Sequence, residues 1–461
     1  MNLVRIVTKN MRQRALATWL TGTSVALGVA LAVAILLIKQ GVQQRFEQGT
    51  LGYEMVVGAK GSPLQLVLNT VYNLDISPGN ISWKLFEQLR DDKRVKLAVP
   101  FSVGDNYHGF RIVGTTDAFF KDFEFEPGRK PELASGRVFN FSEAALKNAF
   151  REAEERARER EAKERGEEFK PASESPTAPK ERPFEAVIGS TVAAEAGLKI
   201  GQTFIAAHGV QPSAEAKEHT ENPWTVVGIL APTQTAVDRA IYINLDSFYH
   251  IEGHEIRAPS GAPKPEKPAP AEEKDNDPDP GQVSSIVVKL KSPIFAFGLY
   301  RELNDRQDAM AAFPAAEIRK LFDIVGNIDK LLLAQAILIL VVAGVAIAVS
   351  IYNSMSERRR EIAILRALGA RRATIFSIVL LEAMTICLVG SAAGLIGGHL
   401  VVAAANGVLY KASGFLIPAF HIQVLEWYIV LIAVVLGAVS GLGPAFGAYR
   451  TDVAKNLAPS S

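Results

Sequence analysis

Four long apolar runs stand out along this chain, at residues 17–38, 331–353, 374–402 and 425–449. A helix needs about 20 predominantly apolar residues to cross a hydrocarbon core about 30 Å thick, and each run is long enough. The pattern predicts four transmembrane helices, with residues 39–330 inserted between the first two. The first run is longer than the apolar part of a signal peptide and lacks a small-residue cleavage site, so we expect a retained helix.

The inserted segment alternates short strand-like and helix-like pieces. β-Branched and aromatic residues bounded by Gly, Pro, Asn and Asp are typical of strands. They predict strands at 54–57, 95–99, 110–113, 186–188, 203–206, 225–230, 240–243 and 285–290, and the remaining periodic pieces predict helices at 82–89, 191–196 and 295–308. The mixture predicts an extracytoplasmic α+β domain, in two lobes because the strands come in two clusters.

Two low-complexity inserts interrupt this domain, at 142–182 and 259–281. The first opens with a Glu/Arg/Lys-rich stretch whose four-residue charge pairs can hold a solvated helix, and it ends in Pro, Ser and Lys. The second is rich in Pro and acidic residues and cannot bury enough apolar surface to fold. Both inserts are predicted to be poorly ordered loops, with a partner-binding arm as the lesser alternative.

Basic residues gather beside the apolar runs on one predicted side of the membrane. Segment 1–16 has four, segment 354–373 has six arginines, and the tail 450–461 has two, whereas the short loop 403–424 has only Lys411. The excess of Lys and Arg on cytoplasmic flanks predicts that both termini lie inside. The totals, Lys+Arg 50 against Asp+Glu 49, exclude a uniformly basic nucleic-acid binder.

Residues 1–16 are predicted to form a helix in the membrane interface, because apolar residues recur there at three- to four-residue spacing. A plain basic flank is the equally weighted alternative.

Segment 354–373, between the second and third runs, is predicted to hold a short amphipathic helix. Ile362, Leu365 and Leu368 share one helical face, and Gly369 stands where a helix would end. The residues alone allow two functions: an anchor on lipid headgroups, or a helix that docks into a groove of a cytoplasmic partner.

The sequence from Glu357 to Arg372, ERRREIAILRALGARR, closely resembles the signature of the FtsX/MacB-type permeases of ABC transporters. The resemblance continues through IFSIVLLEAMTICLVGSAAGLIGG and GLGPAFGAYRTDVAKNL. The stretches VIGSTVAAEAGLKIGQTF and WTVVGILAPTQTAVDRAIYINLDSF are similar to the extracytoplasmic core of that family. The two low-complexity inserts depart from the family pattern.

The resemblance implies a permease subunit in the bacterial inner membrane, as a homodimer or paired with a related permease, with its large domain in the periplasm or outside the cell. It implies a separate cytoplasmic ABC ATPase and allows an external adaptor or substrate protein. The family is associated with export, lipoprotein release and mechanotransmission. By position, the matched ATPase-coupling residues are Glu357, Arg359, Arg360, Glu361, Leu365, Arg366, Gly369, Ala370 and Arg371. The alternative is a membrane-anchored receptor or scaffold without ATPase coupling.

The sequence contains no phosphate-binding loop of the form G-x-x-x-x-G-K-[ST]. Residues 58–62, GAKGS, have similar letters but lack the spacing, and no helix is predicted after them. The chain is therefore expected to be a non-catalytic subunit with no cofactor, and ATP hydrolysis is expected in a partner chain.

Small residues recur in the last two apolar runs and predict close helix packing, either within one chain or at a dimer seam. They are Gly390, Gly394, Gly398, Gly437 and Gly441. Gly443 and Pro444 are predicted to kink or stop the fourth helix.

Glu382 is an acid inside the third run, and a structural partner on another helix is expected for it, because a carboxylate in lipid is costly.

Five histidines of the insertion raise the question of a metal site: His108, His208, His219, His250 and His254. His250 and His254 flank Glu252, but Gly253 disfavours a helix there and no third ligand is evident. No metal site is assigned. The one cysteine, Cys387, excludes an intrachain disulfide.

Overall fold

The computed structural model describes residues 3–13, 15–165, 184–209, 219–251, 281–357, 364, 366–367, 369–413 and 417–449. The chain divides into two compact units, one of residues 1–44 and 323–461 and one of residues 45–322. The first unit is the membrane unit, and the second is the inserted domain.

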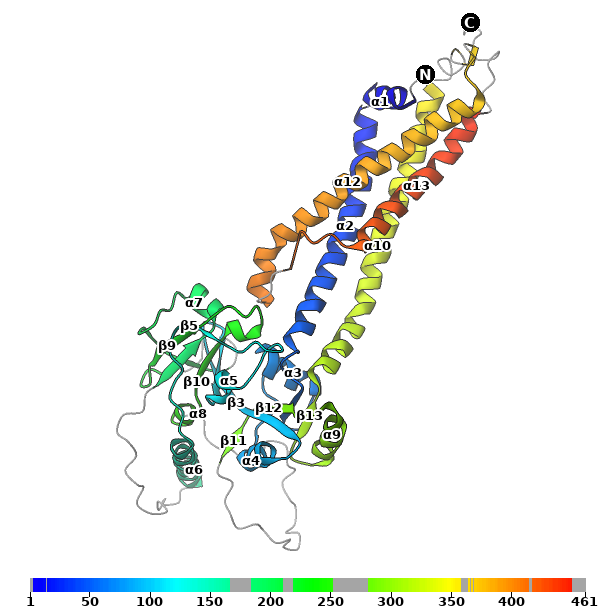
Figure 1. The fold of residues 1–461 in the computed structure, drawn as a ribbon. Coiled ribbons are helices and arrows are strands. Elements are labelled where there is room, and N and C mark those ends of the chain that lie inside the picture. The colour runs from blue at the N-terminus through cyan, green and yellow to red at the C-terminus, as the bar shows by residue number, and fades with distance from the viewer. Residues whose placement is uncertain are drawn as a thin grey trace. The chain divides into compact units, whose positions relative to one another are not determined.

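The membrane unit is built from long helices (Figure 1). They are α1 (Leu3–Gln13), α2 (Ala15–Gly49), α10 (Pro314–Glu357), α12 (Arg372–Ser413) and α13 (Val424–Tyr449). Four of them contain segments long and apolar enough to cross a membrane: Ala15–Gly49, Lys330–Asn353, Arg372–Val408 and Val424–Gly447. The four predicted apolar helices are therefore confirmed.

Two of these helices are much longer than the apolar runs that predicted them. α2 continues past residue 38 to Gly49, and α10 begins at Pro314 instead of residue 331. Hydropathy locates only the part of a helix that can lie in hydrocarbon, whereas Gln, Arg and Glu beyond it still favour helix. The lengths, 35 and 44 residues, correspond to about 50 and 65 Å.

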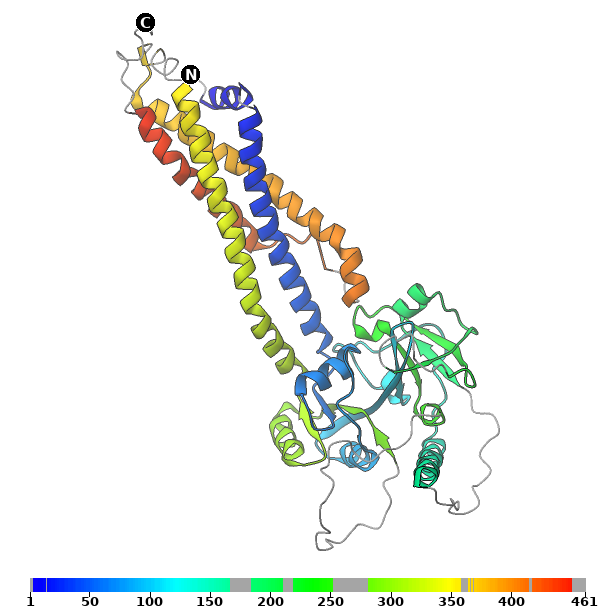
Figure 2. The ribbon, with the colours of Figure 1, turned by 180° about the vertical axis from the view of Figure 1, so that it is seen from behind.

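Apolar side chains of α2, α10 and α12 form the core of the membrane unit. Val25, Val29 and Val33 of α2 are buried together with Leu340 and Ile347 of α10. The views in Figure 1 and Figure 2 both show one bundle, with α1 across the end where α13 finishes. α13 runs through Pro444 to Tyr449, so of the predicted kink or stop the stop is ruled out. Neighbouring helices can compensate the hydrogen bond that a proline removes in a membrane helix.

The inserted domain mixes short helices with strands, as predicted. Its helices are α3 (Pro63–Tyr72), α4 (Trp83–Asp91), α5 (Ala118–Lys121), α6 (Glu143–Arg165), α7 (Ser190–Ala196), η1 (Ala236–Arg239), α8 (Leu245–Phe248), η2 (Pro293–Phe295) and α9 (Ala296–Asp305). Its strands are β1 (Met55–Gly58), β2 (Ile81–Ser82), β3 (Val95–Tyr107), β4 (Phe110–Thr115), β5 (Leu133–Gly136), β6 (Glu185–Ile188), β7 (Thr203–Phe204), β8 (Ala207–His208), β9 (Trp224–Leu230), β10 (Ala240–Asn244), β11 (Gln282–Val283), β12 (Ser285–Leu290) and β13 (Met310–Ala312).

One long strand, β3, connects the two halves of the sheet. The sheet order is β13-β1-β12-β3-β4-β10-β6-β9-β5, with β7 on β9 and β8 on β3. The first half of β3 pairs with β12 and the second half with β4 and β8. The pairs β10–β4 and β6–β9 are parallel and the other pairs are antiparallel. Strands predicted before and after the first insert therefore mix within one sheet, since β4 pairs with β10 and β3 pairs with β12.

The chain enters and leaves the inserted domain on neighbouring strands. β1 follows α2, β13 precedes α10, and the two strands pair antiparallel, with Val56 opposite Ala312 and Gly58 opposite Met310. The sequence located β1 one residue early, and it did not predict β13, which follows the helix predicted at 295–308. The pairing holds both ends of the insertion at one edge of the sheet.

The first low-complexity insert begins with a helix that belongs to the domain core, which corrects the prediction of a solvated helix in a poorly ordered loop. Leu146, Ala149, Phe150 and Ala153 of α6 are fully buried. The Phe150 ring lies 5.2 Å from that of Trp83 and 4.8 Å from that of Tyr249, between centroids. The rest of this insert, and the second insert up to residue 280, lie outside the described residues.

A helix also follows the GAKGS stretch, contrary to prediction. Ser62 caps α3 by accepting a hydrogen bond from the backbone N–H of Gln65 at 3.3 Å, and Pro63 occupies the first helical position. Asn73 ends the helix in the left-handed conformation, with φ 56°. Ser-Pro at the start and Asn at the end are capping signals for a helix. The spacing still does not make a phosphate loop.

Replacing Phe150 by Ala tests whether α6 is part of the core. The loss of a fully buried ring should destabilise the inserted domain by about 3–5 kcal/mol. Urea unfolding of the full chain in detergent, followed by tryptophan fluorescence, measures the shift because Trp83 contacts this ring. Arg151→Ala, at the exposed neighbouring position, should leave the midpoint unchanged; equal midpoints for both variants would contradict the assignment.

Candidate functional site

The segment that connects α10 to α12 contains the predicted coupling residues, of which the structure describes a part. Glu357 is the last residue of α10, whereas Arg359, Arg360, Glu361 and Leu365 lie outside the described residues. Among the described positions, residues 364, 366 and 367 are helical.

A tight turn separates this short helical segment from α12. Gly369 has φ +98° and donates its N–H to the carbonyl oxygen of Arg366 at 3.0 Å. The carbonyl oxygen of Arg371 accepts from the N–H groups of Thr374 at 2.9 Å and Ile375 at 3.4 Å, so α12 starts at once. Ala370 is half-buried and Arg371 is exposed. Only glycine adopts φ +98° without strain, and the helix ends at Gly369 as the sequence predicted.

The beginning of α12 and the end of α13 lie together. The Arg372 guanidinium carbon is 5.6 Å from the centre of the Tyr449 ring, and the Phe376 and Phe446 rings meet edge to face at 5.8 Å. α1 contacts α12 as well, with Val7 buried. The predicted basic flanks that the structure describes therefore gather at one end of the membrane unit.

The first glycine stripe of α12 faces α2 of the same chain. A Cβ atom added to Gly390 would lie 2.8 Å from the carbonyl oxygen of Gly22, one on Gly394 would lie 2.5 Å from that of Ala26, and one on Gly398 would lie 2.8 Å from Cβ of Val33. Real Cβ atoms do not approach so closely, so these positions allow the two backbones to touch.

The second pair of glycines brings α13 onto α12. A Cβ atom on Gly437 would lie 2.3 Å from the Cys387 sulfur, and one on Gly441 would lie 2.9 Å from Cβ of Ala383. Within one chain, both sets of small residues thus lie in helix–helix contacts.

Among the described residues of the membrane unit, two acids are buried, although the sequence drew attention to one. Glu382 of α12 is 8% exposed. Glu426 of α13 is fully buried, and its Oε2 atom lies 3.1 Å from Nε2 of His399, which is also buried.

His399 and Glu426 also hold the loop between α12 and α13. Nδ1 of His399 is 2.6 Å from the carbonyl oxygen of Ala419, and Oε1 of Glu426 accepts from the N–H of Gln423 at 3.2 Å. A carbonyl only accepts, so Nδ1 is the donor in the contact with Ala419. Hydropathy missed this pair because each residue stands alone within apolar sequence.

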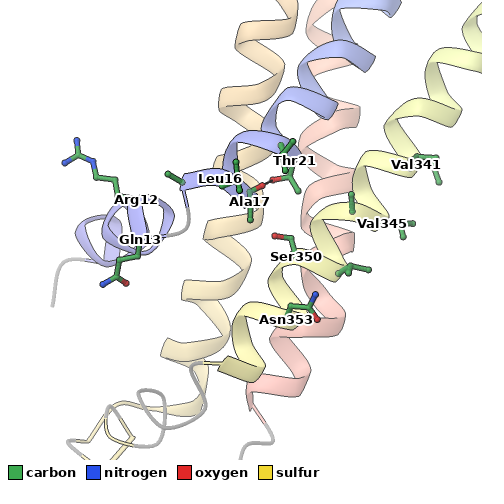
Figure 3. Close-up of a pocket in the computed structure, with 14 residues that line it drawn as sticks. Arg12, Gln13, Leu16, Ala17, Thr21, Val341, Val345, Ser350 and Asn353 are labelled. Atoms are coloured by element: carbon green, nitrogen blue, oxygen red, sulfur yellow. Dashed lines mark hydrogen bonds between the residues drawn. The ribbon is translucent and has the colours of Figure 1, made fainter.

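A groove lies between α2 and α10 toward the end of the bundle that carries α1. It has a volume of about 1110 Å³ and is lined mostly by apolar side chains, with Arg12 and Gln13 of α1 at one margin. Figure 3 shows Leu16, Ala17 and Thr21 on one wall and Val341, Val345, Ser350 and Asn353 on the other.

In the inserted domain, three aromatic side chains, here called the junction cluster, join the last turns of α2 to the first turns of α10. The cluster is Phe46, Tyr72 and Phe322: Phe46 lies 4.7 Å from Tyr72 and 5.7 Å from Phe322, between ring centroids. The Tyr72 hydroxyl donates to the carbonyl oxygen of Phe46 at 2.5 Å. Burial raises the pKa of Tyr72, so this hydroxyl stays protonated and can donate.

Two family profiles match most of this chain. "MacB-like periplasmic core domain" matches residues 18–294, and "FtsX-like permease C-terminal" matches residues 334–453. The chain belongs to the FtsX/MacB-type family of ABC transporter permeases, which confirms the resemblance read from the coupling segment. It is a permease-type, multi-pass inner-membrane protein with a periplasmic-type domain.

Curated relatives share part of this chain. "Macrolide export ATP-binding/permease protein MacB" of Neisseria gonorrhoeae (strain ATCC 700825 / FA 1090) is 28% identical over 249 residues, which are 52% of this chain and 33% of that protein. The protein of the same name from Syntrophobacter fumaroxidans is 35% identical over 127 residues, 27% of this chain and 16% of that one. The chain thus spans about a third or less of the length of these relatives.

Two solved structures show similarity to the chain. The periplasmic region of MacB from Actinobacillus actinomycetemcomitans aligns with 59% of this chain and 94% of its own, at 11% identity and a TM-score of 0.31. The extracellular domain of the noncanonic ABC-type transporter YknZ from Gram-positive bacteria aligns with 56% and 98%, at 13% identity and a TM-score of 0.27.

Gly394→Ala tests the contact between α2 and α12. Its added methyl would meet the Ala26 carbonyl oxygen, so we expect a loss of about 1–3 kcal/mol of stability. The matched control is Gly397→Ala, whose methyl would meet only Cβ of Ala30 at 3.7 Å and should be tolerated. Thermal unfolding in detergent compares the two, and equal midpoints would argue against close backbone packing at Gly394.

Proposed function

We propose that this chain is the transmembrane subunit of an ABC transporter that couples ATP hydrolysis by a separate cytoplasmic ATPase to movement of its extracytoplasmic domain. The observation that carries the proposal is the short helical segment between α10 and α12, ended by Gly369 and followed at once by α12. Its sequence matches the coupling signature of the family, and a short helix joined to a membrane helix by a tight turn can pass a displacement to that helix.

The proposed orientation has both termini and the coupling segment in the cytoplasm. This orientation is supported by three basic residues that lie at one end of the membrane unit: Arg12, Arg371 and Arg372. Tyr449, the last described residue of α13, lies at the same end. Cytoplasmic flanks of membrane helices carry such an excess of basic residues. The inserted domain is then periplasmic or extracellular.

In this proposal α2 and α10 carry the movement between the membrane and the inserted domain. Each is unbroken in the chain from its apolar segment to the residues of the junction cluster. An uninterrupted helix transmits displacement along its axis better than a loop, because its backbone hydrogen bonds resist local bending. The junction cluster and the β1–β13 pair make the sheet respond to both helices together.

The proposed movement of the extracytoplasmic domain serves export, lipoprotein release or mechanotransmission. The relatives' name supports export, whereas a large domain on four spans supports transmission of force. Pairing with a second permease chain, identical or related, belongs to the proposal as the family resemblance implies it, and an external adaptor or substrate protein fits the same scheme. A receptor or scaffold without ATPase coupling is the rival function.

Leu365→Asp should abolish association with the ATPase encoded by a neighbouring reading frame, because it places a charge on the face of the coupling segment that the sequence predicts to be apolar. Co-purification from cells and ATP turnover of the complex are the measurements. Ala367→Asp is the matched control, since residue 367 is exposed and lies on another side of the helix. If the wild-type chain retains no ATPase, the receptor or scaffold becomes the better account.

Phe46→Ala should leave ATPase binding intact and weaken the movement of the inserted domain, because it removes both ring contacts of the junction cluster. Distances between spin labels at exposed Lys147 of two paired chains, with and without ATP, report the movement. Phe297→Ala removes an exposed ring from α9 and serves as the control. A full ATP-dependent distance change in Phe46→Ala would refute the role given to the cluster.

A further inference from the structure

Three potential metal ligands meet at the second half of β3 in the inserted domain. Asp105 on β3 and His208 on β8 are direct partners in an antiparallel pair. Side chains of directly opposed residues lie on the same face of a sheet, so the carboxylate and the imidazole meet there. The Nδ1 atom of His208 is 3.5 Å from Oδ1 of Asp105.

His219 brings the third side chain to the same place. Its backbone N–H donates to the carbonyl oxygen of Ala206 at 2.9 Å, just before β8. Its Nε2 atom is 3.4 Å from the same Asp105 oxygen, and its ring stands nearly perpendicular to that of His208, with 5.7 Å between centroids.

The distances suit a shared metal ion better than direct ion pairs. One ligand atom from each of the three residues lies within 4.8 Å of the others. Two ligand atoms at about 2.0–2.1 Å from one tetrahedral zinc ion are about 3.3 Å apart, close to the observed 3.4 and 3.5 Å. Charge-assisted N–H···O hydrogen bonds are shorter, at about 2.7–2.9 Å.

Burial gives the cluster a closed side and an open side. The Asp105 side chain is fully buried and that of His219 is 6% exposed, whereas that of His208 is 48% exposed. A buried carboxylate is stable only when its charge is compensated, and a divalent cation compensates it fully. The exposed side, at His208, gives an ion from solvent a way in.

We propose that Asp105, His208 and His219 bind a divalent transition-metal ion, with Zn²⁺ the best match to two imidazoles and one carboxylate. Imidazole favours zinc, copper, nickel and iron over calcium and magnesium, which prefer oxygen ligands alone. Three protein ligands leave a fourth tetrahedral position for water or an external ligand on the His208 side. The site is independent of the proposed function, since no coupling residue contributes to it.

Equilibrium dialysis of the full-length chain without a histidine tag against Zn²⁺ tests the proposal. We expect one equivalent of tightly bound zinc, and an affinity lower by about 100-fold or more in His208→Ala and in His219→Ala, since loss of even an outer-shell partner costs 10–100-fold. His208 is half-exposed, so its replacement should leave the fold intact. Substitution with Co²⁺ should give the intense visible absorption of tetrahedral coordination in the wild type alone.

The matched control is His108→Asn. His108 is exposed in a turn of the same domain with φ 49°, a conformation that asparagine tolerates, and it should retain wild-type affinity. Zinc should also raise the thermal midpoint of the wild type and of this control, but not of the two ligand variants. Absence of a tight equivalent in the wild type, or equal binding by His208→Ala and His219→Ala, would overturn the assignment.

Discussion

The antiparallel pairing of β1 with β13 determines how the inserted domain is attached. These short strands are the first and last of the domain, and their pairing brings together two points of the chain separated by some 250 residues. Bringing the ends of so long a segment together lowers the conformational entropy of the chain. The pairing and packing of the strands between β1 and β13 must offset this loss. Because α2 precedes one strand and α10 follows the other, the chain enters and leaves the inserted domain at neighbouring strands, and the junction cluster holds Phe46 and Phe322 close together within that domain. The two ends of the insertion are therefore fixed to each other twice, by strand pairing and by ring packing.

Within the membrane unit, close backbone approach replaces the hydrophobic driving force that lipid removes. Glycines at 390, 394 and 398 let α12 lie against α2, and those at 437 and 441 let α13 lie against α12, so α12 is the helix that both others share. The coupling segment is joined directly to α12 by the turn at Gly369. In the proposed function, a displacement of that segment therefore enters the helix that packs closely against both α2 and α13.

Sequence predicted the parts of the fold whose signal is local and repeated. Four apolar runs located the membrane helices, and β-branched runs located β9, β10 and β12 nearly to the residue. It failed for α6, where an apolar face of only Leu146, Ala149, Phe150 and Ala153 is hidden among charges, and its burial depends on Trp83 and Tyr249 far along the chain. The ends of α2 and α10 were missed because hydropathy measures lipid contact and not helix length. The sequence could not predict that Asp105, His208 and His219 meet, because their meeting depends on the register of β8 against β3, which no local pattern encodes.

The strand that carries Asp105 also connects the two halves of the sheet, with β13, β1 and β12 on one side and the strands from β4 to β5 on the other. The first half of β3 pairs with β12, the neighbour of β1, whereas Asp105 lies in the second half, beside β4 and β8. A metal ion bound by Asp105, His208 and His219 would link β8 and the backbone at His219 to β3. This link lies on the side of β3 that faces β4, away from β1 and β13 in the strand order. The ion should therefore stabilise mainly the half of the sheet from β4 to β5, while the β1–β13 pairing stays the same. Metal binding and attachment to the membrane helices thus fall on different parts of one domain, which β3 and a shared hydrophobic core connect.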